Sequence, residues 1–79
     1  MKPRVLLVDD DSNILSAYKR NMRLHFDIFT ASTAAEGLTI LQERGPFAVV
    51  ISDYYMPEMN GVDFLAEVKK IYPNTVRMM

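Results

Sequence analysis

Two groups of aspartates follow apolar runs of this chain. Asp9–Asp11 come directly after the apolar segment 5–8, and Asp53 follows the apolar segment 47–51 with only Ser52 between them. If these segments are neighbouring strands of a parallel sheet, their carboxyl ends meet at one edge and the carboxylates converge. Convergent negative charges raise one another's pKa and require a cation. A hard divalent ion that prefers oxygen ligands, with Mg²⁺ first, meets that need.

A carboxylate beside such an ion can act as the nucleophile in phosphoryl transfer. Attack by Asp53 would give an aspartyl phosphate, and the metal would neutralise the charge that develops. For Asp9, Asp10 and Asp53 together, we favour this interpretation over merely solvated surface acids. Asp11 precedes Ser12 at a predicted helix start, so for Asp11 a helix cap or a solvated loop residue is favoured.

The apolar pattern predicts the elements that must position these aspartates. Segment 5–8 is apolar and partly β-branched, as in a strand buried on both faces of a parallel sheet. A helix is predicted over 12–24, capped by Ser12. Its apolar residues recur at helical spacing: Ile14, Leu15, Tyr18 and Met22. Segment 26–30 predicts a short second strand.

A second helix is punctuated at both of its ends. Thr33 and Glu36 form a capping box at its start. Leu38 and Leu41 continue its apolar face, and Gly45-Pro46 predicts a left-handed cap followed by a stop. The helix is therefore expected to lie between the second and third strands.

Segment 47–51 has the apolar pattern of the first strand and predicts a third. Asn60 can cap a third helix, whose predicted buried face consists of Phe64, Leu65, Val68 and Ile71. Segment 75–79 reads as the start of a fourth strand. Strands and helices that alternate with short connections predict an α/β fold with parallel strands, right-handed crossovers and helices on the sheet faces.

Composition limits the possible classes of protein. A chain of 79 residues makes at most one small domain, and 49% apolar with 24% charged residues is typical of a globular protein. The net charge of −1 with scattered Lys and Arg does not favour direct contact with nucleic acid. Because we find no signal peptide and no run near the ~20 apolar residues of a membrane span, we expect a cytoplasmic location without membrane contact.

Two motifs resemble those of response-regulator receiver domains. Residues 6–11, Leu-Leu-Val-Asp-Asp-Asp, resemble the family's first strand and acidic pair. Residues 50–57, Val-Ile-Ser-Asp-Tyr-Tyr-Met-Pro, followed by Asn60-Gly61, resemble its phosphorylation loop. The resemblance implies a flavodoxin-like (CheY-like) parallel sheet that is truncated after the start of the fourth strand. Residues 1–79 would then be a partial receiver domain of three βα units plus a fourth strand.

The resemblance also implies roles for individual residues. Asp53 inherits the role of phospho-acceptor, Asp10 that of a direct Mg²⁺ ligand, and Asp9 that of a ligand acting through water. The backbone carbonyl of Tyr55 would complete the protein ligands. The implied partner is a sensor histidine kinase or a phosphotransfer protein. Such a domain is not an enzyme in the ordinary sense, since it catalyses only its own phosphorylation and dephosphorylation.

This sequence departs from the family pattern after the fourth strand. The family's later Ser or Thr and its Lys, which contact the phosphoryl group, are not found, and we transfer no role to Thr75, Lys69 or Lys70. We therefore expect impaired phosphorylation. An unpaired edge at segment 75–79 and an uncovered face of the first and third strands predict a homo-oligomer.

Two alternative interpretations remain at this point. One is a truncated or engineered fragment that self-associates and does not signal. The other is a phosphohydrolase of the haloacid-dehalogenase type, because Asp9-x-Asp11 after an apolar strand also resembles the acidic pair of that family. The second alternative does not account for the motif around Asp53. His25 is interpreted as a surface residue or a partner of a helix C-terminus, and the sequence does not decide whether Tyr54 is buried or used in recognition.

Overall fold

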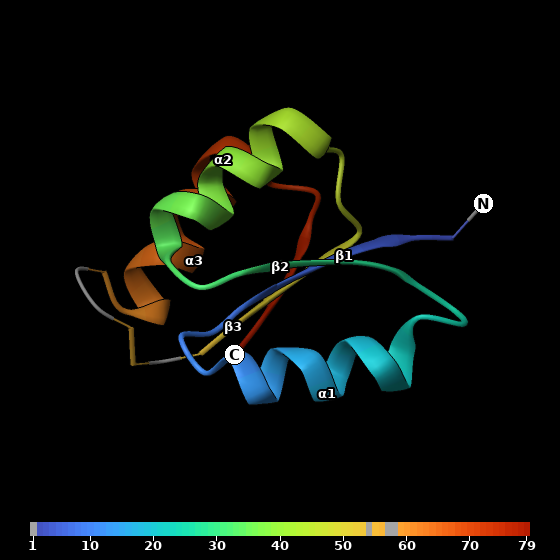
Figure 1. Cartoon of the computed structure of the whole chain (residues 1–79). Helices are drawn as coiled ribbons and strands as arrows, with labels where there is room; N and C mark the ends of the chain where they lie inside the picture. The colour runs from blue at the N-terminus through green and yellow to red at the C-terminus, as the bar shows by residue number, and fades with distance from the viewer. Residues whose placement is uncertain (1, 54, 57–58) are drawn as a thin grey trace.

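The computed structural model describes residues 2–53, 55–56 and 59–79 as four strands and three helices (Figure 1). In chain order these are β1 (Arg4–Val8), α1 (Ser12–Met22), β2 (Asp27–Ala31), α2 (Ala34–Arg44), β3 (Val49–Ser52), α3 (Gly61–Ile71) and β4 (Val76–Met78). The strands form one sheet in the order β2-β1-β3-β4, and every pairing is parallel. The predicted receiver-like α/β fold is thereby confirmed.

The helices cover the two faces of the sheet unequally. Figure 1 shows α1 on one face and both α2 and α3 on the other. Because β1 lies inside the sheet, its side chains are buried on both faces, and residues 5–8 are at most 2% exposed. None of the helices in the described residues has the length and apolar character needed to cross a bilayer.

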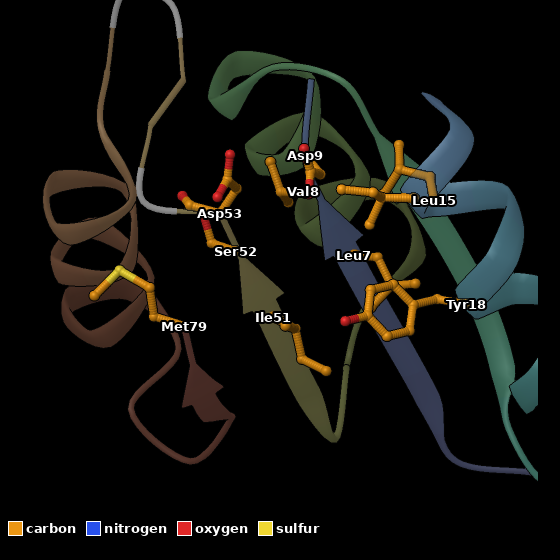
Figure 2. Close-up of a pocket in the computed structure, with 10 residues that line it drawn as sticks. Leu7, Val8, Asp9, Leu15, Tyr18, Ile51, Ser52, Asp53 and Met79 are labelled. Carbon is orange, nitrogen blue, oxygen red and sulfur yellow. The ribbon is translucent and has the colours of Figure 1, made fainter. Parts of the chain in front are cut away.

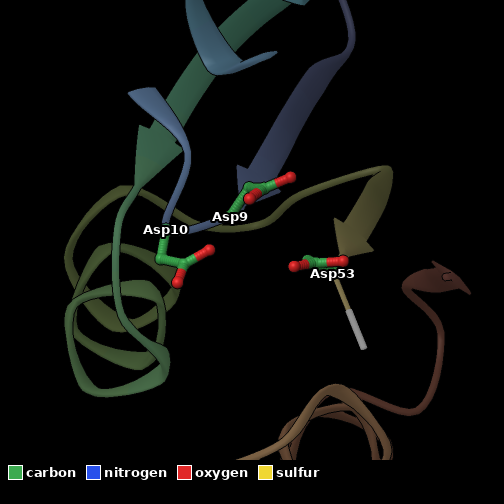
Figure 3. Close-up of side chains that lie close together, drawn as sticks. All are labelled: Asp9, Asp10 and Asp53. Carbon is green, nitrogen blue, oxygen red and sulfur yellow. The ribbon is translucent and has the colours of Figure 1, made fainter. Parts of the chain in front are cut away.

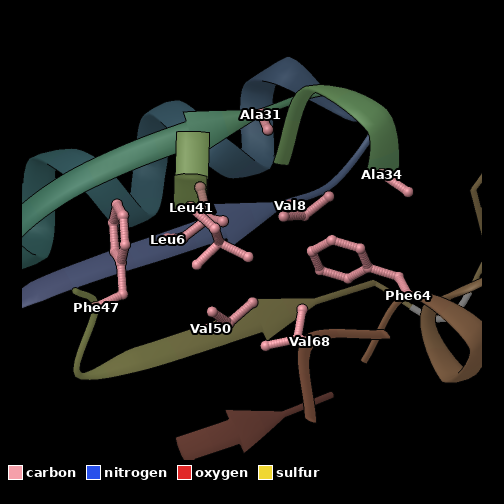
Figure 4. Close-up of a cluster of buried hydrophobic side chains, with 9 residues drawn as sticks. All are labelled: Leu6, Val8, Ala31, Ala34, Leu41, Phe47, Val50, Phe64 and Val68. Carbon is pink, nitrogen blue, oxygen red and sulfur yellow. The ribbon is translucent and has the colours of Figure 1, made fainter. Parts of the chain in front are cut away.

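The larger core lies between the sheet and the helices α2 and α3. Figure 4 shows its side chains converging from both layers, with the Phe64 ring pointing in from α3 near Val8. Its buried members are Leu6, Val8, Ala31, Ala34, Leu41, Phe47, Val50, Phe64 and Val68. The smaller core, under α1, consists of Val5, Leu7, Leu15 and Ile28. Successive residues of β1 pack alternately into the two cores, because successive side chains of a strand point to opposite faces of the sheet.

The helix starts agree with the sequence at α2 and α3 but not at α1. Thr33 caps α2 by accepting the amide of Glu36, and Asn60 caps α3 by accepting the amide of Asp63. At α1 the cap is Asp11, so the prediction of Ser12 as the cap was wrong. The Asp11 backbone is extended, with φ −94° and ψ 103°, whereas Ser12 is already helical.

Two further expectations about the helices were wrong, the left-handed cap at Gly45 and the burial of Ile71. Gly45 ends α2 in an extended conformation, with φ −66° and ψ 171°, rather than a left-handed one. In α1, Ile14 and Tyr18 are 41% and 50% exposed, and Ile71 of α3 is 54% exposed. For α1 the reason is geometric: it packs toward β2 at one side of the sheet, so part of its apolar face lies beyond the strands it covers.

Candidate functional site

The site lies where the two central strands end. β1 and β3 pair in parallel with Val8 opposite Ser52, so the following residues, Asp9 and Asp53, leave the sheet side by side. Backbone hydrogen bonds continue past the strand ends. The Asp53 amide donates to the Val8 carbonyl at 2.9 Å, and the Asp9 amide donates to the Ala31 carbonyl at 3.0 Å. The backbones of both aspartates are therefore fixed by the sheet.

Three carboxylates converge at this edge. Asp9, Asp10 and Asp53 each contribute one oxygen, and these oxygens lie within 4.8 Å of one another. Figure 3 shows Asp10 and Asp53 facing each other from the two strand ends, with Asp9 beside them. Asp9 and Asp53 are half-buried, and Asp10 is exposed. Asp11 is not a member of this group, because its carboxylate accepts the first amides of α1.

The electrostatics of the cluster favour protonation or a bound cation. Burial raises the pKa of Asp9, and the charges of Asp53, Asp10 and Asp11 raise it further, while a hydrogen bond from the Asp11 amide acts in the opposite direction. Within the described residues, no Lys or Arg forms an ion pair with the cluster; the two ion pairs seen there are Arg4–Asp27 and Lys70–Glu67. The negative charge is thus not neutralised by nearby basic side chains.

The donor set fits a hard divalent cation. Mg²⁺ binds oxygen atoms at about 2.0–2.1 Å, so two of its ligands lie up to roughly 4.2 Å apart. Cluster oxygens within 4.8 Å of one another reach this spacing with small side-chain movements. Tyr55, the remaining predicted ligand, lies beside Asp10, since both line a shallow hollow of about 310 Å³ together with Met56 and Asn60.

An apolar hollow adjoins the cluster on the α1 side of the sheet, a feature that sequence reasoning missed. It has a volume of about 390 Å³, and Figure 2 shows it extending from Asp9 and Asp53 along β1 and β3. Its other lining residues are Leu7, Val8, Ile14, Leu15, Tyr18, Ile51, Ser52 and Met79. The sequence identified Ile14 and Tyr18 only as apolar residues at helical spacing, and nothing in it indicated that they border the site.

Ser52 is a second residue that sequence reasoning missed. Its side chain is buried, 2% exposed, and its hydroxyl donates to the Asp53 carbonyl at 3.0 Å. The hydrogen bond helps to fix the backbone that carries Asp53. The sequence feature that could have identified Ser52 was a small polar residue at the end of an otherwise apolar strand.

The other residues singled out in the sequence lie away from the cluster or outside the described residues. His25 is exposed beyond the C-terminal end of α1, and Lys69 and Lys70 are exposed in the last turn of α3. Thr75 is buried and donates to the Phe47 carbonyl at 2.9 Å, a structural hydrogen bond before β4. Tyr54 and Pro57, which belong to the predicted phosphorylation loop, lie outside the described residues.

Comparison with known proteins identifies relatives over nearly the whole chain. A family model described as the response regulator receiver domain matches residues 5–79. The chain is 37% identical over 75 residues to the hydrogenase transcriptional regulatory protein HoxA of Cupriavidus necator, covering 95% of this chain and 15% of that protein. It is 41% identical over 68 residues to the transcriptional regulatory protein PrrA of Mycobacterium tuberculosis, covering 85% of this chain and 29% of that protein.

A solved structure has the same arrangement of strands and helices. The response regulator receiver domain protein from Clostridium thermocellum superposes with a TM-score of 0.89 at 38% identity, covering 95% of this chain and 61% of that one. The chain therefore spans less than a third of the two curated relatives and about three fifths of this solved receiver.

Proposed function

Because this chain belongs to the family of response regulator receiver domains, which are signalling modules, we propose that it accepts a phosphoryl group in a two-component phosphorelay. The proposed acceptor is Asp53, the proposed cofactor is Mg²⁺, and the proposed donor is a sensor histidine kinase or a phosphotransfer protein. The observation that carries the proposal is the convergence of Asp9, Asp10 and Asp53 within 4.8 Å at the strand ends. In this proposal residues 1–79 supply three βα units and a fourth strand of a receiver domain.

The chemistry assigned to this chain is a single transfer. A carboxylate oxygen of Asp53 attacks the phosphorus atom, an oxygen–phosphorus bond forms, and the phosphorus–nitrogen bond of the donor phosphohistidine breaks. Asp9, Asp10 and the Tyr55 carbonyl are the proposed protein ligands of Mg²⁺ besides Asp53, with Asp9 acting through water. When bound, the ion neutralises charge on the phosphoryl oxygens. The chain catalyses only its own phosphorylation and dephosphorylation.

The transfer is proposed to be slow in this 79-residue chain. The four lysines of the described residues lie before β1 or in the last turns of helices: Lys2, Lys19, Lys69 and Lys70. Because the helices run antiparallel to the strands, these positions are at the end of the sheet opposite the cluster. A lysine contact to a phosphoryl oxygen contributes about 1.5–3 kcal/mol, and none of these four lysines is placed to make that contact at the cluster.

Incubation with Mg²⁺ and acetyl phosphate, followed by intact mass spectrometry, tests the proposed function. We expect one added phosphoryl group on the wild-type chain and none on Asp53→Asn, because the amide is not a nucleophile for this transfer. Asp63→Asn is the matched control, since Asp63 is an exposed acid in the first turn of α3 and should leave the adduct intact. A folded wild-type chain without an adduct, or an adduct that survives in Asp53→Asn, contradicts the proposal.

The dehalogenase-type alternative gains no support. It needs the Asp11 carboxylate as an acid or base beside Asp9. In the structure that carboxylate accepts the amides of Asn13 at 2.9 Å and Ile14 at 3.3 Å. The comparisons point to receiver domains rather than hydrolases, and they give no support to an engineered fragment without signalling activity.

We further propose that the 79-residue chain self-associates with a second copy through the β4 edge or through the uncovered face of β1 and β3. β4 is an edge of the described sheet, and its residues Val76 and Met78 are 56% and 53% exposed. Multi-angle light scattering is expected to show a dimer or larger species, and Val76→Lys/Met78→Lys is expected to shift it toward monomer. A monodisperse wild-type monomer contradicts this proposal.

The cellular setting that we propose is cytoplasmic, without direct contact between residues 1–79 and nucleic acid.

A further inference from the structure

The loop between β1 and α1 is held by hydrogen bonds that converge on Asp11. Its carboxylate oxygen Oδ1 accepts the amides of Asn13 at 2.9 Å and Ile14 at 3.3 Å, which caps α1. Its own amide donates to Oδ1 of Asp9 at 2.9 Å. Asp11 therefore joins the first turn of α1 to the carboxylate of a cluster residue.

The same loop is fixed at its other end by the sheet. The Asp9 amide donates to the Ala31 carbonyl at 3.0 Å, where β1 pairs with β2. Asp10 is thus the only loop residue between two anchored positions, Asp9 on the sheet and Asp11 on the helix. Asp10 is exposed, so burial restrains its carboxylate less than the two anchors restrain its backbone. Its placement depends on the two anchors.

We infer that Asp11 is a positioning residue for the acidic cluster. By capping α1 and donating its amide to Asp9, it holds the carboxylates of Asp9 and Asp10 in the arrangement that meets Asp53. The inference rests on the proposed function in one respect, that the cluster binds Mg²⁺. The inference assigns the effect of Asp11 on Mg²⁺ binding to the geometry of the helix cap rather than to its negative charge. Asp11 is not itself a metal ligand in this proposal, because its carboxylate is directed to the amides of α1.

Three variants separate the possible roles of Asp11. Asp11→Asn keeps a side-chain oxygen that caps a helix as well as aspartate does, but removes the charge. Asp11→Ala removes both the cap and the charge. Thr33→Ala removes the equivalent cap of α2, where Thr33 accepts the amide of Glu36 at 3.1 Å, without touching the cluster. It is the matched control for loss of a helix cap as such.

The affinity for Mg²⁺ is measured by titration of the 79-residue chain, followed by amide chemical shifts in NMR spectra, alongside urea denaturation. Asp11→Ala and Thr33→Ala are expected to show similar drops in the urea midpoint. Only Asp11→Ala is expected to raise the dissociation constant for Mg²⁺, by roughly tenfold or more, as for loss of groups that orient metal ligands. Asp11→Asn should stay within about threefold of the wild type, because it retains the cap.

Hydrogen exchange supplies a readout that needs no metal. In Asp11→Ala the amide of residue 11, which donates to Asp9 Oδ1 in the wild type, is expected to exchange at least about tenfold faster than in the wild type, whereas in Thr33→Ala its exchange should not change. Equal weakening of Mg²⁺ binding by Asp11→Asn and Asp11→Ala would assign the effect to charge and overturn the inference. Unchanged binding in Asp11→Ala would also overturn it.

Failure of the proposed metal site has a different signature. If the folded wild-type chain does not bind Mg²⁺, the metal proposal fails, and exchange of the residue 11 amide alone decides the positioning role. Unchanged exchange in Asp11→Ala would then reject that role.

Discussion

Phe64→Ala is expected to lower the free energy of unfolding by about 3–5 kcal/mol, as for other large aromatic residues removed from a core. Phe64 is 0% exposed, and its ring lies among side chains of the sheet, α2 and α3 (Figure 4). A chain of 79 residues has a typical stability of roughly 4–12 kcal/mol. The substitution should therefore remove a large fraction of the stability and lower the urea midpoint, which urea denaturation followed by circular dichroism will measure.

The neighbourhood of Phe64 explains why the cavity should not collapse. Gly37 of α2 sits directly against the ring, and a Cβ at that position would lie 3.1 Å from both Phe64 and Val8. The sheet and two helices fix the remaining walls. Ile71→Ala is the matched control on the same helix, because Ile71 is 54% exposed, and it should cost less than about 1 kcal/mol. Equal costs for the two substitutions would contradict this description of the core.

The sequence predicted the centre of the fold better than its borders. Four consecutive apolar residues at 5–8 are buried as expected, because an inner parallel strand has helices on both faces. Periodicity also identified a face for each helix. It did not show how far the sheet extends under that face. Ile71 was expected to be buried and is exposed, and Ile14 and Tyr18 on the apolar face of α1 are exposed as well.

At the site, residue type and strand order were enough to bring Asp9, Asp10 and Asp53 together. Residue type was not enough to identify the cap of α1, because Asp11 and Ser12 are both good capping residues and the backbone angles decide between them. The hydrogen bond from the Asp11 amide to Asp9 could not be predicted, since it depends on the path of the backbone over residues 9–11. Asp9 lies opposite Asp53 because the register of β1 and β3 places Val8 opposite Ser52.

Asp9→Asn is expected to have opposite effects on stability with and without Mg²⁺. Burial and the neighbouring carboxylates raise the pKa of Asp9 in the folded chain. Ionisation of Asp9 therefore disfavours folding, and this cost is complete at pH values above the folded-state pKa. Asparagine carries no charge and can still accept the Asp11 amide through Oδ1. In EDTA at pH 7 the variant should melt at a higher temperature than the wild type.

Bound Mg²⁺ should reverse this order. At ten times its dissociation constant a ligand stabilises the folded state by about 1.4 kcal/mol, which raises the melting temperature of a small domain by on the order of 5–10 °C. The wild-type chain should show that rise, and Asp9→Asn should lose most of it, since a carboxylate of the cluster is gone. Asp63→Asn, outside the cluster, should keep the full rise.

The pH dependence in EDTA distinguishes a charge effect from a change in packing. As the pH falls through the folded-state pKa of Asp9, the wild-type carboxylate becomes protonated and its unfavourable contribution to folding disappears. The melting temperatures of the wild type and Asp9→Asn should therefore converge at acidic pH. A constant difference at all pH values, or a variant less stable than the wild type in EDTA at pH 7, would contradict the prediction. Convergence together with the reversal by Mg²⁺ would mean that the acidic cluster destabilises the metal-free fold and that a bound cation offsets this.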